Sequence, residues 1–163
     1  MLKIIKYPDS ILRKIAKPVL VFDAALEKLV EQMAEIMYRD DGIGLAAPQV
    51  NVSQSIVVIG NENGRGYKAY INPEITFSSK DKKLNEEGCL SLPEIFGWVR
   101  RPKKIHLKYQ DIKGKIYKEK FSGLDAVILQ HEIDHLSGIL FIDRAEKISR
   151  GADILATLRN GGK

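Results

Sequence analysis

The stretch LQHEIDHLSG, Leu129 to Gly138, carries two histidines four residues apart, with a glutamate directly after the first. If the stretch is helical, positions i and i+4 project from one face, and the imidazoles of His131 and His135 can bind the same cation. Glu132 is offset by one position, where its carboxylate can accept a proton from water beside an open coordination position. The pattern therefore indicates a metal-binding helix with hydrolytic chemistry.

The residues around this stretch support a helix. Ser122, followed three residues later by Asp125, has the pattern of a capping box, and Gly138 is typical of a helix end. Apolar residues also recur at helical spacing from Asp23 to Asp41, which predicts an amphipathic helix near the N-terminus. A third helix is predicted from Arg144 to Arg159.

Four short strands are predicted between the first two helices, at 55–60, 68–75, 103–110 and 115–121. The turn DIKG, Asp111 to Gly114, joins the last two as a hairpin, and strands joined this closely are mostly antiparallel. The predicted fold class is α+β, with short, mostly antiparallel sheets packed around a central metal-binding helix, an N-terminal amphipathic helix and a C-terminal helix. Residues 1–163 are expected to form a single catalytic domain, frayed at 160–163.

Composition and charge limit the functional classes. Apolar residues make up 44% and charged residues 29% of the 163 residues, as in globular domains. Neither the N-terminus, MLKIIKYPDS, nor any later run approaches the roughly 18 apolar residues of a membrane helix, so a cytoplasmic protein without a membrane partner is expected. The net charge is +5, and nine Lys or Arg between Arg100 and Lys120 face only Asp111 and Glu119. This excess fits an anionic partner or, more commonly, the solvated face of a hairpin, and no DNA partner is expected.

A catalytic metal site needs a third protein ligand besides the two histidines. Downstream of His135 there is no further histidine, and Glu146 lies beyond a predicted turn. Upstream, EEGCLSLPE (Glu86 to Glu94) holds the only cysteine, Cys89, whose thiolate would be a strong donor. A single cysteine can also be a buried small hydrophobe. The remaining histidine, His106, lies in an alternating strand pattern and is expected to face solvent.

A second upstream stretch, DGIGLAAPQV (Asp41 to Val50), combines glycine and alanine, whose small size lets another backbone or a substrate approach closely. Gln49 adds an amide donor near its end. The same pattern also fits a helix C-cap followed by a loop, and it lacks the G-K-[ST] of a phosphate loop.

Three stretches together, GIGLAAPQ (Gly42 to Gln49), EGCLS (Glu87 to Ser91) and QHEIDH (Gln130 to His135), resemble the signature motifs of the peptide deformylase family. They occur in the family's order, and the resemblance extends over nearly the whole chain. It implies an enzyme that removes the N-formyl group from the N-terminal formyl-methionine of newly made proteins and releases formate.

The resemblance also implies roles for single residues. The metal ligands would be Cys89, His131 and His135. Glu132 would act as general base and acid, and the formyl oxygen would be held by Gln49 and the backbone N–H of Leu90. The family uses Fe2+ in the cell, and because a Cys-His-His set accepts several divalent ions, Zn2+, Ni2+ or Co2+ can replace it.

Substrate contacts are implied in the same way. An apolar stripe on the predicted helix runs into the first histidine and would line the methionine pocket: Leu124, Val127 and Ile128. The backbone of Ile43 and Gly44 would pair with the bound peptide as an added strand. Glu87 and Arg101 would support the metal loop from outside.

Two further features concern partners. Where some bacterial members have an arginine that binds the peptide backbone, EIFGWVRR places Phe96, flanked by Ile95 and Trp98, so an apolar cleft edge is expected. The segment from Arg144 to Lys163 has five basic and two acidic residues. In related enzymes a basic terminal helix docks at the ribosome, which makes ribosome binding through this segment a hypothesis here.

Two alternatives to the deformylase stay open at the level of sequence. One is a metallopeptidase that cuts internal peptide bonds, which the missing downstream ligand disfavours. The other is a binding module with a structural metal site that contacts ribosomal RNA, although closed structural sites generally use four protein ligands.

Overall fold

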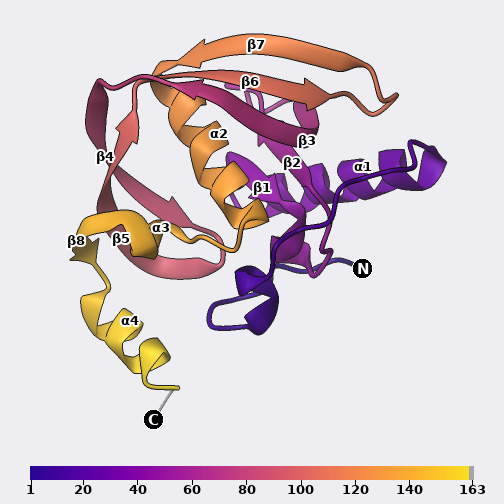
Figure 1. The fold of residues 1–163 in the computed structure, drawn as a ribbon. Helices are drawn as coiled ribbons and strands as arrows, with labels where there is room; N and C mark the ends of the chain where they lie inside the picture. The colour runs from indigo at the N-terminus through magenta and orange to yellow at the C-terminus, as the bar shows by residue number, and fades with distance from the viewer. Residues whose placement is uncertain (162–163) are drawn as a thin grey trace.

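Helix α2 (Gly123–Leu136) occupies the centre of the molecule and contacts both of its sheets (Figure 1). The computed structural model describes residues 1–161. The larger sheet has the strand order β1 (Gly44–Ala46), β2 (Ile56–Gly60), β3 (Tyr67–Ser78), β6 (Lys104–Gln110) and β7 (Ile116–Ser122). The smaller sheet has the order β4 (Lys82–Cys89), β5 (Leu92–Pro102) and β8 (Ala145–Arg150). All of these strand pairs are antiparallel, and the predicted α+β class is confirmed.

The amphipathic helix α1 (Ala24–Arg39) forms near the N-terminus as predicted. The side chain of Asp23 accepts a hydrogen bond from the backbone N–H of Leu26 at 3.0 Å, which satisfies one of the free donors of the first turn. The apolar face of α1 packs against β1 and β2 in one core cluster. Two short 3-10 helices, η1 (Ser10–Arg13) and η2 (Ala47–Val50), flank this layer in the chain.

Helix α2 starts without the predicted capping box. Ser122 is its N-cap residue, but the Ser122 side chain makes no capping hydrogen bond. The reason is that Ser122 still pairs with Lys104 as the last residue of β7, and Gly123, with a φ of 61°, turns the chain straight into the helix. At the other end Gly138 follows the helix in the left-handed conformation, with a φ of 72°, as its position predicted.

The C-terminal segment is not the single helix predicted from Arg144 to Arg159. It consists of α3 (Phe141–Arg144), strand β8 and α4 (Ala152–Arg159). Strand β8 pairs with β5, and this pairing between distant parts of the chain overrides the local helical preference. Asn160 and Gly161 form a turn, whereas 162–163, where fraying was also predicted, lie outside the described residues.

The core follows the strand alternation that the sequence shows. In β6 the residues 105, 107 and 109 are buried against α2, and the residues between them face outward. A further cluster joins β5 to α3 and α4 through buried residues that include Ile95, Phe141 and Leu155. Among residues 1–161, none of the helices combines the length and the apolar character that crossing a lipid bilayer requires.

Candidate active site

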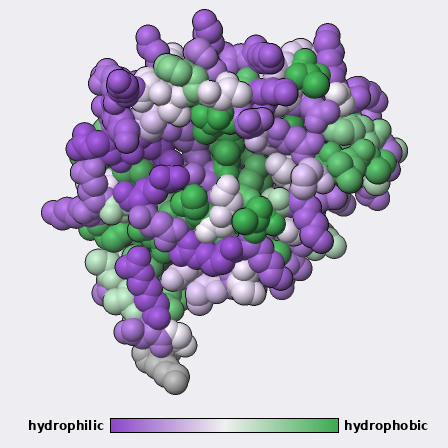
Figure 2. All heavy atoms as spheres, viewed as in Figure 1, coloured by the Kyte–Doolittle hydropathy of each residue, from purple (hydrophilic) through white to green (hydrophobic). Residues whose placement is uncertain are grey.

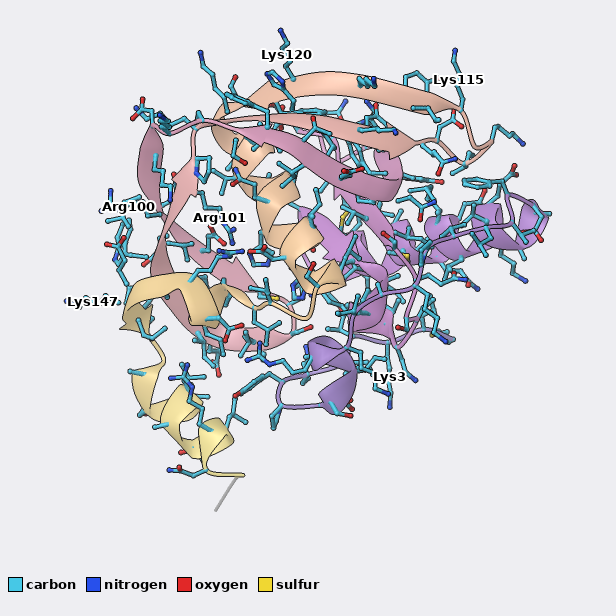
Figure 3. All side chains as sticks on the ribbon, viewed as in Figure 1. Lys3, Arg100, Arg101, Lys115, Lys120 and Lys147 are labelled. Carbon is cyan, nitrogen blue, oxygen red and sulfur yellow. The ribbon has the colours of Figure 1, made fainter. Side chains whose placement is uncertain are left out.

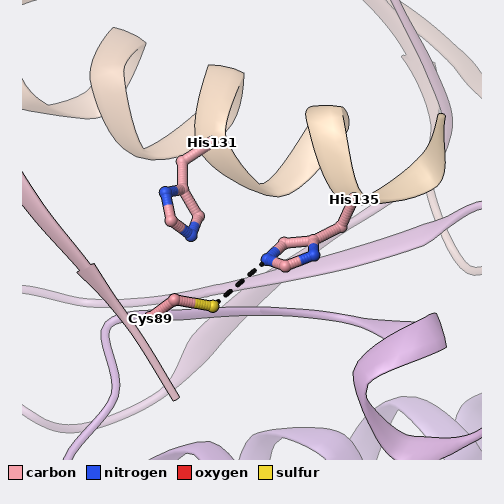
Figure 4. A group of neighbouring side chains, drawn as sticks. All are labelled: Cys89, His131 and His135. Atoms are coloured by element: carbon pink, nitrogen blue, oxygen red, sulfur yellow. Dashed lines mark hydrogen bonds between the residues drawn. The ribbon is translucent and has the colours of Figure 1, made fainter. Parts of the chain in front are cut away.

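Two elements bring together the three residues predicted to bind a metal. Cys89 is the last residue of β4, where a shift in the β4–β5 register follows Gly88. His131 and His135 lie one turn apart on α2 and point toward Cys89 (Figure 4). Their donor atoms all lie within 4.8 Å of one another, and Cys89 Sγ is 3.4 Å from His135 Nε2.

This donor set fits a divalent transition metal. A thiolate with two imidazoles suits zinc or iron rather than calcium or magnesium, which prefer oxygen ligands. His131 Nδ1 lies 2.8 Å from Glu87 Oε1, so its other ring nitrogen, Nε2, is left for a metal. Three protein ligands, rather than four, are typical of catalytic sites.

Glu87 is held by a buried network behind the histidine. Arg101, with 3% of its side chain exposed, donates to both carboxylate oxygens of Glu87 at 2.6 and 2.9 Å and to Asp134 at 2.9 Å. Burial alone would raise the pKa of Glu87, but the hydrogen bonds from His131 and Arg101 outweigh it and lower that pKa. Arg144 also binds Asp134, at 2.7 Å. The sequence pointed to Glu87 and Arg101 as supports of the metal loop and missed Asp134.

Glu132 lies beside the three donors, buried and without a partner for one oxygen. Its Oε2 has no hydrogen-bond partner among residues 1–161. A Cβ atom on Gly44 would come within 2.9 Å of Glu132 Oε1, so a side chain at this position would displace the Glu132 carboxylate. Burial raises the pKa of Glu132 to about 7, which suits a group that must both accept and donate a proton near neutral pH.

The amide of Gln49 has a fixed orientation. Its Oε1 accepts a hydrogen bond from the backbone N–H of Ala46 at 2.9 Å, so its Nε2 points toward Ser91 Oγ at 3.2 Å and Cys89 Sγ at 3.4 Å. Ser91 is fully buried. It ends the EGCLS motif, but its contact with Gln49 was not predicted.

Leu90, next to Cys89, is also held in place. Its side chain lies against Gly42, where an added Cβ would be 2.7 Å from Leu90 Cδ1. The carbonyl of Leu90 accepts a hydrogen bond from Lys6 Nζ at 2.9 Å. Lys6 was not predicted, because the contact joins residues 84 positions apart.

A cleft of about 580 Å³ opens onto these groups. Its walls include the apolar stripe predicted on the helix: Leu124, Val127 and Ile128. Ile43 and Gly44 line it as well. The carbonyl of Ile43 accepts from Gly60 N–H at 2.9 Å, and because inter-strand bonds alternate along an antiparallel pair, the N–H and C=O of Gly44 point away from β2, toward the outer edge of β1.

The cleft edge around Phe96 is only partly as predicted. Phe96 lines the cleft, its ring lies against Gly88, and the Arg150 guanidinium lies 4.0 Å from the centre of the ring. Ile95 is instead fully buried in the core, and Trp98 is not among the lining residues. Strand alternation explains the burial of Ile95, because neighbouring residues of β5 point to opposite faces. Trp98 lies two residues beyond Phe96 on β5, past a shift in the register of this strand with β8.

The position of Glu146 argues against the alternative of a metallopeptidase that cuts internal peptide bonds. Glu146, the one downstream acidic candidate, lies on β8 and pairs with Arg100 at 2.8 Å, away from the three metal donors. In the part of the chain that the structure describes, a buried carboxylate with one oxygen lacking a partner lies beside a three-donor cluster that a cleft reaches, and this arrangement defines a metal-dependent hydrolase.

Comparison with known proteins narrows this class to one family. The family profile described as polypeptide deformylase matches residues 1–151. The chain belongs to the peptide deformylase family. It is therefore an enzyme that removes the N-formyl group from newly made polypeptides.

Individual relatives agree over nearly their whole length. The peptide deformylase of Thermotoga neapolitana is 46% identical over 150 residues, which cover 92% of this chain and 90% of that protein. The crystal structure of the Thermotoga maritima peptide deformylase superposes with a TM-score of 0.86 at 48% identity, covering 90% of this chain and 99% of that one. A Plasmodium falciparum peptide deformylase structure gives a TM-score of 0.89 at 40% identity, covering 97% and 94%.

Proposed function

We propose that the cluster of Cys89, His131 and His135 holds the catalytic metal of this deformylase and that Glu132 carries the proton. The observation that supports this most directly is the position of Glu132 beside three converging metal donors: its buried Oε2 has no hydrogen-bond partner within the described residues, 1–161. When bound, the metal supplies a Lewis acid that polarises the formyl carbonyl and makes water more acidic.

Glu132 accepts a proton from water as the water oxygen attacks the formyl carbon. When the C–N bond breaks, Glu132 passes that proton to the departing nitrogen, which leaves formate and a free amino group. Gln49 Nε2 and the backbone N–H of Leu90 donate to the formyl oxygen as negative charge develops on it. The bond from Ala46 to Gln49 Oε1 supports this role, because it fixes which end of the amide points toward Cys89.

Glu87 and Arg101, which lie behind the metal ligands, have a positioning role. We assign Glu87 to orienting the imidazole of His131 and Arg101 to holding Glu87 in place. Substrate binding is assigned to the outer edge of β1 at Gly44, beside Ile43, where the peptide would add as a strand. The formyl-methionine side chain would occupy the pocket of Leu124, Val127 and Ile128.

Formate release tests the function directly. Protein purified without oxygen should release formate from formyl-Met-Ala-Ser, and no release from a metal-loaded sample would contradict the assignment.

We propose Fe2+ as the native ion, replaceable by Zn2+, Ni2+ or Co2+, because thiolate and imidazole ligands accept all four. Metal analysis of the anaerobic sample, with activity followed after exposure to air, would separate iron from zinc.

Replacing Val127 with phenylalanine should raise KM for formyl-Met-Ala-Ser, because the larger ring would fill the space of the methionine side chain. Steady-state kinetics of formate release measure this change. A matched substrate serves as the control: KM for formyl-Ala-Ala-Ser, with its short side chain, should rise less. Equal changes for both substrates would place Val127 outside the pocket.

We further propose that the enzyme is cytoplasmic and that residues 1–163 act as one catalytic domain.

We also propose that the basic C-terminal segment, from Arg144 to Lys163, binds the ribosome. Leu155 of this segment is buried in the core, so truncation would disturb the fold. Exposed Lys147 and Arg159 are better probes. Changing both to glutamine should reduce co-sedimentation with ribosomes, and unchanged co-sedimentation would rule out this segment.

A further inference from the structure

The basic excess between Arg100 and Lys120 is not explained by the deformylase reaction. The structure divides its nine cations into two groups. Five have a partner, either a carboxylate or an aromatic ring: Arg100, Arg101, Lys103, Lys113 and Lys115. Four make no ion pair with any residue in 1–161: Lys104, Lys108, Lys118 and Lys120.

The four unpaired lysines share one face of strands β6 and β7. Because the odd-numbered residues of β6 are buried, Lys104, His106 and Lys108 point to the outer face, away from α2. Lys118 is directly opposite Lys108, and Lys120 is directly opposite His106. Figure 3 shows Lys120 extending outward above β7, and Figure 2 shows mostly hydrophilic residues along this upper edge.

This arrangement is electrostatically unfavourable in the isolated protein. Like charges directly opposite each other on neighbouring strands destabilise a sheet. Protection of an edge strand would explain lysines on β7, but β6 lies inside the sheet, between β3 and β7. Glu74 pairs opposite Lys108, yet the two form no ion pair within the described part of the chain. A polyanion bound to this face would relieve the repulsion.

An exposed aromatic ring lies beside these cations. Phe77 on β3 has 48% of its surface exposed and is paired opposite His106, with 4.5 Å between the ring centres. Lysines that contact phosphates, together with an exposed ring on which a base can stack, are the two elements of single-stranded nucleic-acid binding. A polyanion without bases would use the lysines and leave Phe77 without a role.

We propose that this outer face of β3, β6 and β7 binds single-stranded RNA, with phosphates at the four lysines and an unpaired base on Phe77. RNA is favoured over DNA because the enzyme acts on newly made polypeptides, which are made by RNA-rich machinery. The RNA site is separate from the catalytic cleft, since none of the residues lining the cleft comes from these three strands.

Fluorescence anisotropy with a labelled single-stranded RNA of about 16 nucleotides tests the proposal over a range of salt concentrations. The face variant changes Lys104, Lys108, Lys118 and Lys120 to glutamine. The control variant makes the same change at four exposed lysines elsewhere: Lys3, Lys14, Lys17 and Lys28. Both variants have the same net charge, so any difference between them comes from position.

The face variant should lose about tenfold or more in affinity for RNA. The slope of the logarithm of the association constant against the logarithm of the salt concentration should become shallower by about 3, because four phosphate contacts are lost at roughly 0.7 each. The control variant should keep most of its affinity. Phe77→Leu should weaken binding by about fivefold or more through lost stacking, with the salt slope unchanged. Formate release should match the parent protein in every variant, which shows that each one folds.

Three outcomes would overturn the proposal. The first is that the parent protein shows no saturable RNA binding, and the second is that the face and control variants weaken equally. The third is tighter binding to a DNA strand of the same sequence than to the RNA. If the fourfold variant fails to fold, the pair Lys108→Gln with Lys118→Gln and the single change Phe77→Leu provide the same comparison.

Discussion

Glu132→Gln should lower kcat for formyl-Met-Ala-Ser by about 100- to 10,000-fold, the usual contribution of a general base. Glutamine keeps the shape of the side chain but cannot take a proton from water or return it to the leaving nitrogen. Its carboxylate is buried and makes no hydrogen bond through Oε2 within residues 1–161, so the change should not break a structural contact. Formate release measures the effect, with metal content determined on the same sample.

Glu146→Gln is the matched control for this change. Glu146 is an exposed carboxylate whose partner is Arg100, and it is also the acidic residue that an ordinary metallopeptidase would need downstream. Its removal should leave kcat nearly unchanged. If Glu132→Gln kept kcat within about tenfold of the parent with metal bound, Glu132 would not be the group that moves the proton.

Arg101→Ala should have the largest effect on stability. It removes the cation that binds Glu87 and Asp134 inside the protein, and breaking a buried pair costs about 3–5 kcal/mol because the remaining charge stays desolvated. For a chain of this size the melting temperature should fall by about 6–20 °C. Metal affinity should fall by about 10- to 100-fold, since Glu87 would no longer be held against His131.

The neighbouring residue provides the control. Arg100 points outward in Figure 3, and its pair with Glu146 is about half exposed on both sides, so Arg100→Ala should change the melting temperature little. Calorimetry and metal analysis on both variants give the comparison. Equal melting temperatures and equal metal retention would show that the Arg101 network does not support the metal centre.

Local patterns were enough to predict the elements with strong periodicity. Helices α1 and α2 and the hairpin of β6 and β7 formed where apolar spacing and turn residues placed them. Strands β1, β4, β5 and β8 were not predicted. Strand β1 has three buried residues and no alternation, and β4 is mostly polar. Their strand conformation depends on pairing with distant parts of the chain, which a local window does not contain.

The site residues divide in the same way, into those that a local pattern indicates and those that depend on distant contacts. The spacing of His131 and His135 was readable because both lie on one helix, and Cys89 was found through its motif. Asp134 and Ser91 were missed, because their contacts with Arg101 and Gln49 exist only once the two sheets have come together. The local sequence around Asp134 and Ser91 carries no sign of these contacts.

The placement of the three metal donors has a consequence for cohesion. Cys89 ends a strand of the smaller sheet, whereas His131 and His135 lie on the helix that continues directly from the larger one. An ion bound by all three would therefore connect the two sheets, which are hydrogen-bonded separately. Binding of the ion would then also stabilise the contact between the two sheets. Loss of the ion would lower both the catalytic activity and the free energy needed to separate the sheets.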